Sequence, residues 1–240
     1  MKTNVKLTVV YDNNPIQKGL QTDWGFSCLI EIKNNMILFD TGENGKILLD
    51  NMEKLGIDPK SIDTVVLSHF HHDHSGGLKD FLQTNSEVKV YYPQSFPQEL
   101  IDVIINSGAE PVSVSNSIEI LPDVYSLGEI DGIIPEQSVA LRSSEGIVII
   151  TGCAHPGILN ILQKAKNKFP EEVIYLALGG FHLHRLNAIE INEVIQKIFN
   201  MEILTVAPTH CTGNEARKIF KEVFDADYTE VGVGKVITID

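Results

Sequence analysis

The chain has 240 residues, of which 43% are hydrophobic and 21% charged, which is typical of one large α/β domain with a sizeable core. Its 19 basic and 32 acidic residues give a formal net charge of −13, whereas nucleic-acid-binding surfaces normally carry a basic excess, so no nucleic-acid partner is expected. No apolar run approaches the roughly 20 residues that span a bilayer, and the N-terminus lacks the apolar core of a signal peptide. With only three scattered cysteines, these features predict a cytoplasmic protein that does not enter a membrane.

Strands dominate the first ninety residues. They share runs of β-branched and aromatic residues bounded by turn formers, and we expect them at Val5–Tyr11, Phe26–Ile32, Met36–Phe39, Thr64–Leu67 and Val88–Tyr92. The second and third of these form a hairpin. Helices are expected from Lys46 to Leu55 and from Gly77 to Leu82.

Strands and helices alternate in the last hundred residues. The expected strands are Gly146–Thr151, Val173–Leu178, Ile203–Ala207 and Val231–Ile239. The expected helices are Pro156–Phe169, Ala188–Phe199 and Asn214–Phe224. Pro156 is expected in the first turn of its helix, where a missing N–H costs nothing. Residues 93–145 are the least regular part, with one helix over Gln98–Asn106 and several strands. The whole pattern predicts an α/β fold with mixed sheets.

The strongest local signal is a histidine-rich segment directly after a predicted buried strand. Residues 68–77 are Ser-His-Phe-His-His-Asp-His-Ser-Gly-Gly, which spaces His69, His71, Asp73 and His74 as H-x-H-x-D-H. Imidazole and carboxylate groups are the ligands expected for zinc, and they also suit manganese or iron. The alternative is a solvated surface tract, but that explains neither the buried strand before it nor the isolated histidines after later strands.

Further candidate ligands follow other predicted strands. Asp40 ends the third strand, Cys153 and His155 follow the strand that ends at position 151, and His182 and His210 follow the next two strands along the chain. In α/β sheets, ligand sites gather beyond the carboxyl ends of strands. We therefore expect these side chains to converge.

These residues resemble the metallo-β-lactamase superfamily. The resemblance is carried by the H-x-H-x-D-H motif, by Leu38-Phe39-Asp40-Thr41-Gly42 before it and by the lone histidines after it, and it extends along nearly the whole chain. It is closer to the 7,8-dihydropterin-6-methyl-4-(β-D-ribofuranosyl)aminobenzene-5'-phosphate synthase-like group, on residues 12–14, 151–157, 179–183 and 210–213. The resemblance implies an αββα sandwich of two mixed sheets flanked by helices, in a single domain over residues 1–240.

The resemblance also implies two divalent metal ions, with zinc expected first and manganese, iron or magnesium as alternatives. The implied ligands, three for each ion, are His69, His71 and His155, then Asp73, His74 and His210. Many superfamily members add an aspartate that bridges the two ions, but no such aspartate is apparent here, and Cys153 is the nearest candidate. Cys153 is either a ligand or a packed thiol, and the common burial of free cysteine favours the packed thiol.

Other side chains have supporting roles in this hypothesis. Asp40 is expected to orient a ligand imidazole rather than to touch metal. Asp73 is expected to align the nucleophile as well as to bind metal. His182 is a proton donor to the leaving group, a further ligand, or a histidine that only caps the glycines before it, and the functional roles are preferred. The expected substrate-binding residues are Asn13, Trp24 and Thr212.

The predicted function is metal-dependent hydrolysis of a small ester, specifically a phosphoester or phosphodiester. Two metal ions lower the pKa of a bridging water from about 15.7 towards neutrality. One alternative is a dihydropterin pyrophosphate-dependent synthase, which ranks second because 10 Phe, 6 Tyr and 1 Trp offer no obvious pterin slot. The other is a non-catalytic metal- or ligand-sensing module. The expected partner is a small-molecule substrate, and homo-oligomerisation is left open.

Overall fold

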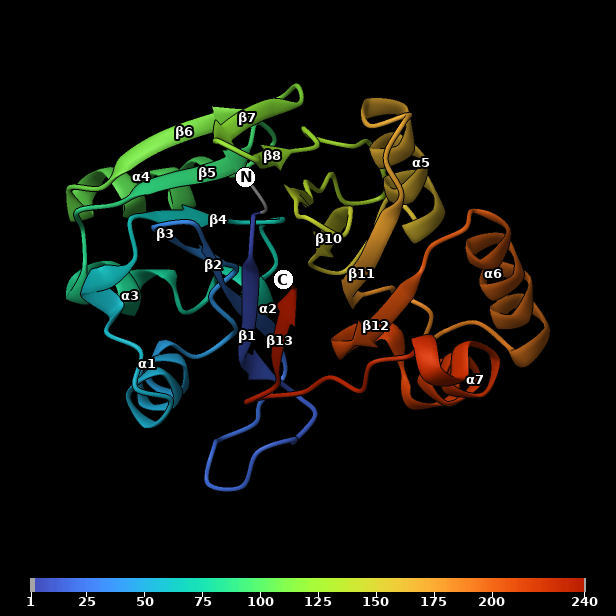
Figure 1. The fold of residues 1–240 in the computed structure, drawn as a ribbon. Helices are drawn as coiled ribbons and strands as arrows, with labels where there is room; N and C mark the ends of the chain where they lie inside the picture. The colour runs from blue at the N-terminus through green and yellow to red at the C-terminus, as the bar shows by residue number, and fades with distance from the viewer. Residues whose placement is uncertain (1–2, 240) are drawn as a thin grey trace. The chain divides into compact units, whose positions relative to one another are not determined.

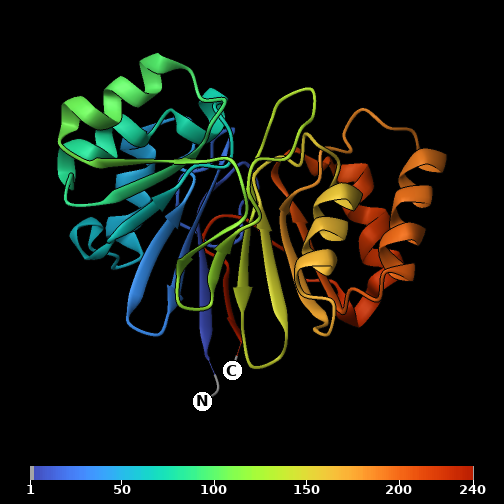
Figure 2. The same ribbon diagram turned by 90° about the horizontal axis from the view of Figure 1, so that it is seen from above.

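The computed structural model describes residues 3–239, which divide into two compact units. Of the described residues, 3–115 and 232–239 form unit 1, and Asn116–Val231 form unit 2. Each unit has one mixed β-sheet flanked by helices (Figures 1 and 2), so the predicted α/β class with two mixed sheets is confirmed. Within residues 3–239, no helix is long and apolar enough to cross a membrane.

The sheet of unit 1 has seven strands in the order β13-β1-β2-β3-β4-β5-β6. Their bounds are β1 Val5–Asp12, β2 Phe26–Ile32, β3 Asn35–Phe39, β4 Thr64–Val66, β5 Lys89–Pro93, β6 Glu110–Val114 and β13 Val236–Ile239. The β2–β3 hairpin is confirmed as an antiparallel pair, and β3 to β6 run parallel. The carboxyl ends of β3 and β4 therefore meet at one edge of the sheet, and the histidine-rich segment begins there.

Helices connect the parallel strands of unit 1. They are α1 Gly45–Lys54, η1 Pro59–Ser61, α2 His72–Ser75, α3 Leu78–Thr84 and α4 Gln98–Ser107. The Asn44 side chain caps α1 by accepting from the N–H groups of residues 46 and 47. Met52, Phe81 and Ile104 face the sheet and are fully buried. Each such side chain contributes about 1.5–3 kcal/mol relative to exposure to water, and together they hold the crossovers on the sheet.

The sheet of unit 2 has six strands in the order β12-β11-β10-β9-β8-β7. Their bounds are β7 Ile118–Leu121, β8 Val124–Ser126, β9 Val139–Arg142, β10 Ile147–Thr151, β11 Ile174–Gly180 and β12 Thr205–Thr209. Strands β10, β11 and β12 are parallel, and β7 to β10 pair antiparallel. Because the three parallel strands are neighbours, the loops after them emerge at the same edge.

The helices of unit 2 are α5 Ile158–Lys168, α6 Ala188–Asn200, η2 His210–Thr212, α7 Asn214–Phe224 and η3 Asp225–Asp227. In Figures 1 and 2, α5, α6 and α7 lie along one face of the sheet. Buried side chains such as Leu162, Ile195 and Phe220 pack with Ile149 of the sheet in one core. A capping box of Asn187 and Glu190 begins α6. These helices fix the start and end of each loop at the sheet edge.

Several predicted boundaries differ from those of the structure, and two of them are informative. Helix α5 begins at Ile158, so Pro156 lies before it rather than in its first turn. The reason is Gly157, whose φ of 93° is incompatible with a helix, and whose N–H donates to the Ala154 carbonyl in a tight turn. The last strand is also shorter than predicted and starts at Val236.

Candidate functional site

The histidine-rich segment of unit 1 begins where β4 ends. His69 is fully buried, and the short helix α2 turns the chain so that His74 is fully buried as well. The Thr41 hydroxyl donates to the His74 carbonyl at 3.0 Å, and a Cβ on Gly77 would lie 2.3 Å from the Thr41 carbonyl oxygen. Only glycine therefore lets the loop pack this closely against the end of β3.

Asp40 holds this loop from the end of β3. Its carboxylate is fully buried; one oxygen accepts from the Ser68 N–H and the other from the Ser68 hydroxyl, each at 2.7 Å. The second oxygen also accepts from His74 Nδ1 at 2.6 Å. Burial raises the pKa of Asp40, while the charge and hydrogen bond of His74 oppose that rise. The contact assigns the proton of His74 to Nδ1, so that Nε2 is the ring nitrogen that could bind a metal ion.

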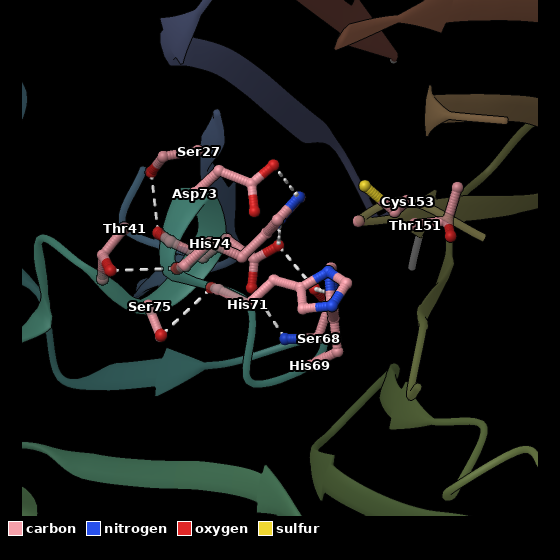
Figure 3. A network of polar contacts seen from close by, with 12 residues as sticks. Ser27, Thr41, Ser68, His69, His71, Asp73, His74, Ser75, Thr151 and Cys153 are labelled. Carbon is pink, nitrogen blue, oxygen red and sulfur yellow. Dashed lines mark hydrogen bonds and ion pairs between the residues drawn. The ribbon is translucent and has the colours of Figure 1, made fainter. Parts of the chain in front are cut away.

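The donor atoms of His69, His71 and Asp73 lie within 4.8 Å of one another. His69 Nδ1 is 2.9 Å from the Ser68 hydroxyl, and His69 Nε2 is 3.2 Å from His71 Nδ1. An Asp73 carboxylate oxygen is 3.6 Å from His74 Nε2. Nitrogen ligands of one tetrahedral zinc ion stand about 3.3 Å apart, because each bond is about 2.0–2.1 Å long. The donor spacing and chemistry therefore suit a metal ion. Figure 3 shows this loop with the side chains of Ser27, Thr41 and Ser75. Their hydroxyl groups donate to the backbone carbonyls of residues 40, 74 and 71, respectively.

Unit 2 has a buried carboxylate of its own, Glu136, in the irregular segment before β9. One of its oxygens accepts four hydrogen bonds of 3.0–3.1 Å, from the Thr151 hydroxyl and the N–H groups of residues 152–154. The other accepts from the His155 N–H at 2.9 Å and from His155 Nδ1 at 3.1 Å. Glu136 is fully buried. It holds the whole loop after β10 and, like Asp40, contacts the Nδ1 of a histidine, so that Nε2 is the ring nitrogen that could bind a metal ion.

His182 lies after β11, next to two cysteines of the neighbouring loops. Donor atoms of Cys153, His182 and Cys211 lie within 4.8 Å of one another, and the Cys211 thiol donates to the Cys153 carbonyl at 3.5 Å. Within residues 3–239, His182 Nδ1 is buried and has no hydrogen-bond partner. The side chain of Cys211, which is hydrogen-bonded to the imidazole, raises the pKa of His182, whereas burial lowers it. The ring centroid of His182 is 4.6 Å from that of His155.

His210 and Thr212 follow β12 in the short helix η2. His210 is buried and has a φ of 48°, so the backbone turns at this residue. Thr212 was expected to contact substrate. Its hydroxyl instead accepts from the Phe181 N–H at 3.0 Å and donates to the Thr209 carbonyl at 2.6 Å, and the residue is fully buried. This geometry joins the loops after β11 and β12.

The other two expected substrate contacts belong to unit 1. Asn13 is half-buried in the turn after β1, and Trp24 is 47% exposed at the end of the long loop before β2 (Figure 1). An exposed tryptophan on a loop is available to a ligand. Their role in substrate binding stays a prediction.

Known proteins share both this sequence pattern and this fold. Residues 25–133 match the sequence model of the metallo-beta-lactamase superfamily. The chain is 28% identical to the 7,8-dihydropterin-6-methyl-4-(beta-D-ribofuranosyl)-aminobenzene-5'-phosphate synthase of Methanocaldococcus jannaschii, over 98% of this chain and 96% of that protein. A metal-dependent hydrolase of the beta-lactamase superfamily superposes with a TM-score of 0.82 at 28% identity, over 97% of this chain and 98% of its own.

The chain thus resembles the metallo-beta-lactamase superfamily in sequence over residues 25–133 and in fold. A diphosphatase of the PhnP family shares the fold, with a TM-score of 0.65 at 14% identity over 100% of this chain and 98% of its own. The superfamily typically binds metal ions, and the histidine, aspartate and cysteine groups described above suit that chemistry.

Glu136 is a site residue that the sequence analysis missed. It lies in residues 93–145, where no periodic pattern was found. The available signal was the run Glu136-Gln137-Ser138 directly before the apolar residues Val139–Leu141. All three polar residues of that run are fully buried, which is rare for glutamate unless it is paired.

Proposed function

We propose that this chain is a metal-dependent hydrolase that cleaves a small phosphoester or phosphodiester with water. One observation carries the proposal. In each unit a fully buried carboxylate, Asp40 or Glu136, accepts a hydrogen bond from the Nδ1 of a histidine, so that Nε2 is the ring nitrogen that could bind a metal ion. This carboxylate–histidine arrangement is characteristic of metal sites. The proposed ligands of two divalent ions, with zinc expected first, are His69, His71 and His155, then Asp73, His74 and His210.

The described residues have distinct roles in the proposed reaction. Bound metal would supply Lewis acidity and lower the pKa of a water molecule. Asp40 and Glu136 keep their histidines in the tautomer that ligates through Nε2. The Asp73 side chain is only 16% exposed and is proposed to align the attacking water as well as to bind metal. His182 is proposed to give its proton to the oxygen of the leaving alcohol as the phosphorus–oxygen bond breaks.

A dihydropterin pyrophosphate-dependent synthase is the second candidate. It is favoured by the 28% identity over 98% of the chain to the synthase from Methanocaldococcus jannaschii. The same metal ligands suit a diphosphate group and a phosphoester equally well. Incubation with a dihydropterin pyrophosphate and an arylamine separates the two functions, because a synthase joins the amine nitrogen to the pterin methylene carbon and releases pyrophosphate, whereas a hydrolase transfers the phosphoryl group to water and leaves the arylamine unchanged.

Elemental analysis with a phosphodiesterase assay tests the hydrolase proposal. We expect about two zinc or manganese ions per chain and turnover of bis-p-nitrophenyl phosphate. His69→Ala is expected to lose both the activity and bound metal. His72→Ala is the matched control, because His72 is exposed in the same loop, and it should retain both. Protein that binds no metal even after reconstitution would overturn the proposal, and full metal occupancy without turnover would favour the synthase or a sensing module.

Substitution of cobalt(II) for the native ion tests the role of Cys153. A thiolate ligand adds a charge-transfer absorption in the near ultraviolet, whereas a packed thiol adds none. Because the burial of Cys153 favours a packed thiol, we expect no band, although its sulfur lies near two other donors, His182 and Cys211; a band that Cys153→Ser removes would make Cys153 a ligand. Cys28→Ser is the control, since Cys28 is buried in the sheet of unit 1. Absence of the band in the wild-type protein would leave Cys153 as a packed thiol.

A further inference from the structure

A cavity of about 320 Å³ lies within unit 2 beside His155 and His182. The start of α5, the loop after β11 and one residue of α6 line it. Packed protein interiors contain few voids larger than a water molecule, and small-molecule sites begin at about 300 Å³. The cavity therefore has the size of a ligand site rather than of a packing defect.

The lining of this cavity is mostly apolar, and its polar side chains are His155, Asn160 and His182. Its hydrocarbon side chains include Ile158, Leu183, Leu186 and Val194, and no aspartate, glutamate, lysine or arginine lines it. The one amide, Asn160, already donates to the Pro156 carbonyl at 2.7 Å. A phosphate or carboxylate placed here would face hydrocarbon side chains and gain no lysine or arginine in return for the hydration it loses. The cavity is suited to the uncharged part of a molecule.

The shape of the group follows from the volume and the neighbouring rings. One water molecule occupies about 30 Å³ of liquid, so about ten waters fill this space, which is close to the volume of a two-ring group. A rigid aromatic group loses little conformational entropy on binding, and His155 and His182 are among the residues that line the cavity.

We propose that this cavity binds a flat, uncharged aryl or heteroaromatic group of the substrate, next to His182. The inference rests on the proposed function for its link to catalysis, because it makes the substrate an aryl phosphoester and the cavity the binding site of the leaving group. The binding itself requires only unit 2, since every lining residue lies between Ala154 and Val194. Binding is therefore measurable without metal.

The experiment is a calorimetric titration of the metal-free full-length protein with 1-naphthol. We expect saturable binding, which inorganic phosphate does not displace. Val194→Trp, which places a large ring in the cavity, is expected to weaken the affinity at least tenfold. Ile189→Trp is the matched control, because Ile189 lies on the same helix and is 74% exposed; it should leave the affinity unchanged. If Val194→Trp fails to fold, Leu186→Trp replaces it as the variant that fills the cavity, because Leu186 lines the cavity from the loop between β11 and α6.

Each outcome bears on one proposal only. Naphthol binding that is lost in the filling variants and retained in the control supports the cavity assignment. No binding by the wild-type protein, or binding unchanged in a folded filling variant, overturns it even when bis-p-nitrophenyl phosphate is turned over. Naphthol binding without phosphoesterase activity of the metal-loaded protein overturns the hydrolase and leaves the cavity standing. If both hold, kcat/KM for 1-naphthyl phosphate should exceed that for methyl phosphate, and Val194→Trp should abolish the difference.

Discussion

Each unit holds its histidine-containing loop with one buried carboxylate, but the two carboxylates come from different kinds of segment and accept from different groups. In unit 1, Asp40 comes directly from the end of β3 and accepts two hydrogen bonds from Ser68 and one from His74. In unit 2, Glu136 comes from an irregular segment and accepts mostly from backbone N–H groups of residues 152–155. The carboxylate of unit 1 thus mainly positions side chains. The carboxylate of unit 2 also serves as the hydrogen-bond acceptor for the backbone N–H groups of its loop.

Glu136→Ala tests this difference with the largest expected effect. The substitution leaves several buried N–H groups without an acceptor, each at a cost of about 1–3 kcal/mol. We expect the free energy of unfolding of the metal-free protein to fall by about 3–5 kcal/mol in urea denaturation, and we expect a smaller loss for Asp40→Ala. Glu145→Ala, an exposed carboxylate of unit 2, should change it by less than about 0.5 kcal/mol. Equal losses for the two buried carboxylates would remove the distinction between the units.

Asp40→Asn tests whether the buried carboxylate of unit 1 contributes to metal affinity. An amide keeps one acceptor for Ser68 but no longer stabilises the His74 tautomer with a charge. Loss of such a carboxylate partner typically weakens metal affinity about 10–100-fold, with little loss of fold. Titration against a chelating dye measures it, and Asp80→Asn, on the exposed side of α3, is the control. If the metal affinity of Asp40→Asn matched that of the wild type, the carboxylate would have no role beyond packing.

The same contrast explains what the sequence predicts and what it does not. Asp40 was found because it ends a predicted strand and precedes a helix, so local pattern places it. Helix α7 was predicted with the bounds Asn214–Phe224 that the structure has, because its apolar spacing is regular. Strands β7, β8 and β9 have only three or four residues each, too few for a period to be read. Glu136 lies beside them, and its burial results from contacts 15 to 19 residues along the chain.

Thr212→Val has the smallest expected effect and separates support from substrate contact in the loops of unit 2. The valine keeps the shape but neither accepts from the Phe181 N–H nor donates to the Thr209 carbonyl. We expect the free energy of unfolding to fall by about 1–2 kcal/mol. A support role leaves KM unchanged, since the hydroxyl is fully buried, whereas a substrate contact raises KM. Thr84→Val is the control, because that hydroxyl donates to the Asp80 carbonyl on an exposed helix, and its loss should change neither quantity appreciably. A raised KM with unchanged stability would show that the loop after β12 opens to substrate, and the scaffold role of unit 2 would then rest on Glu136 alone.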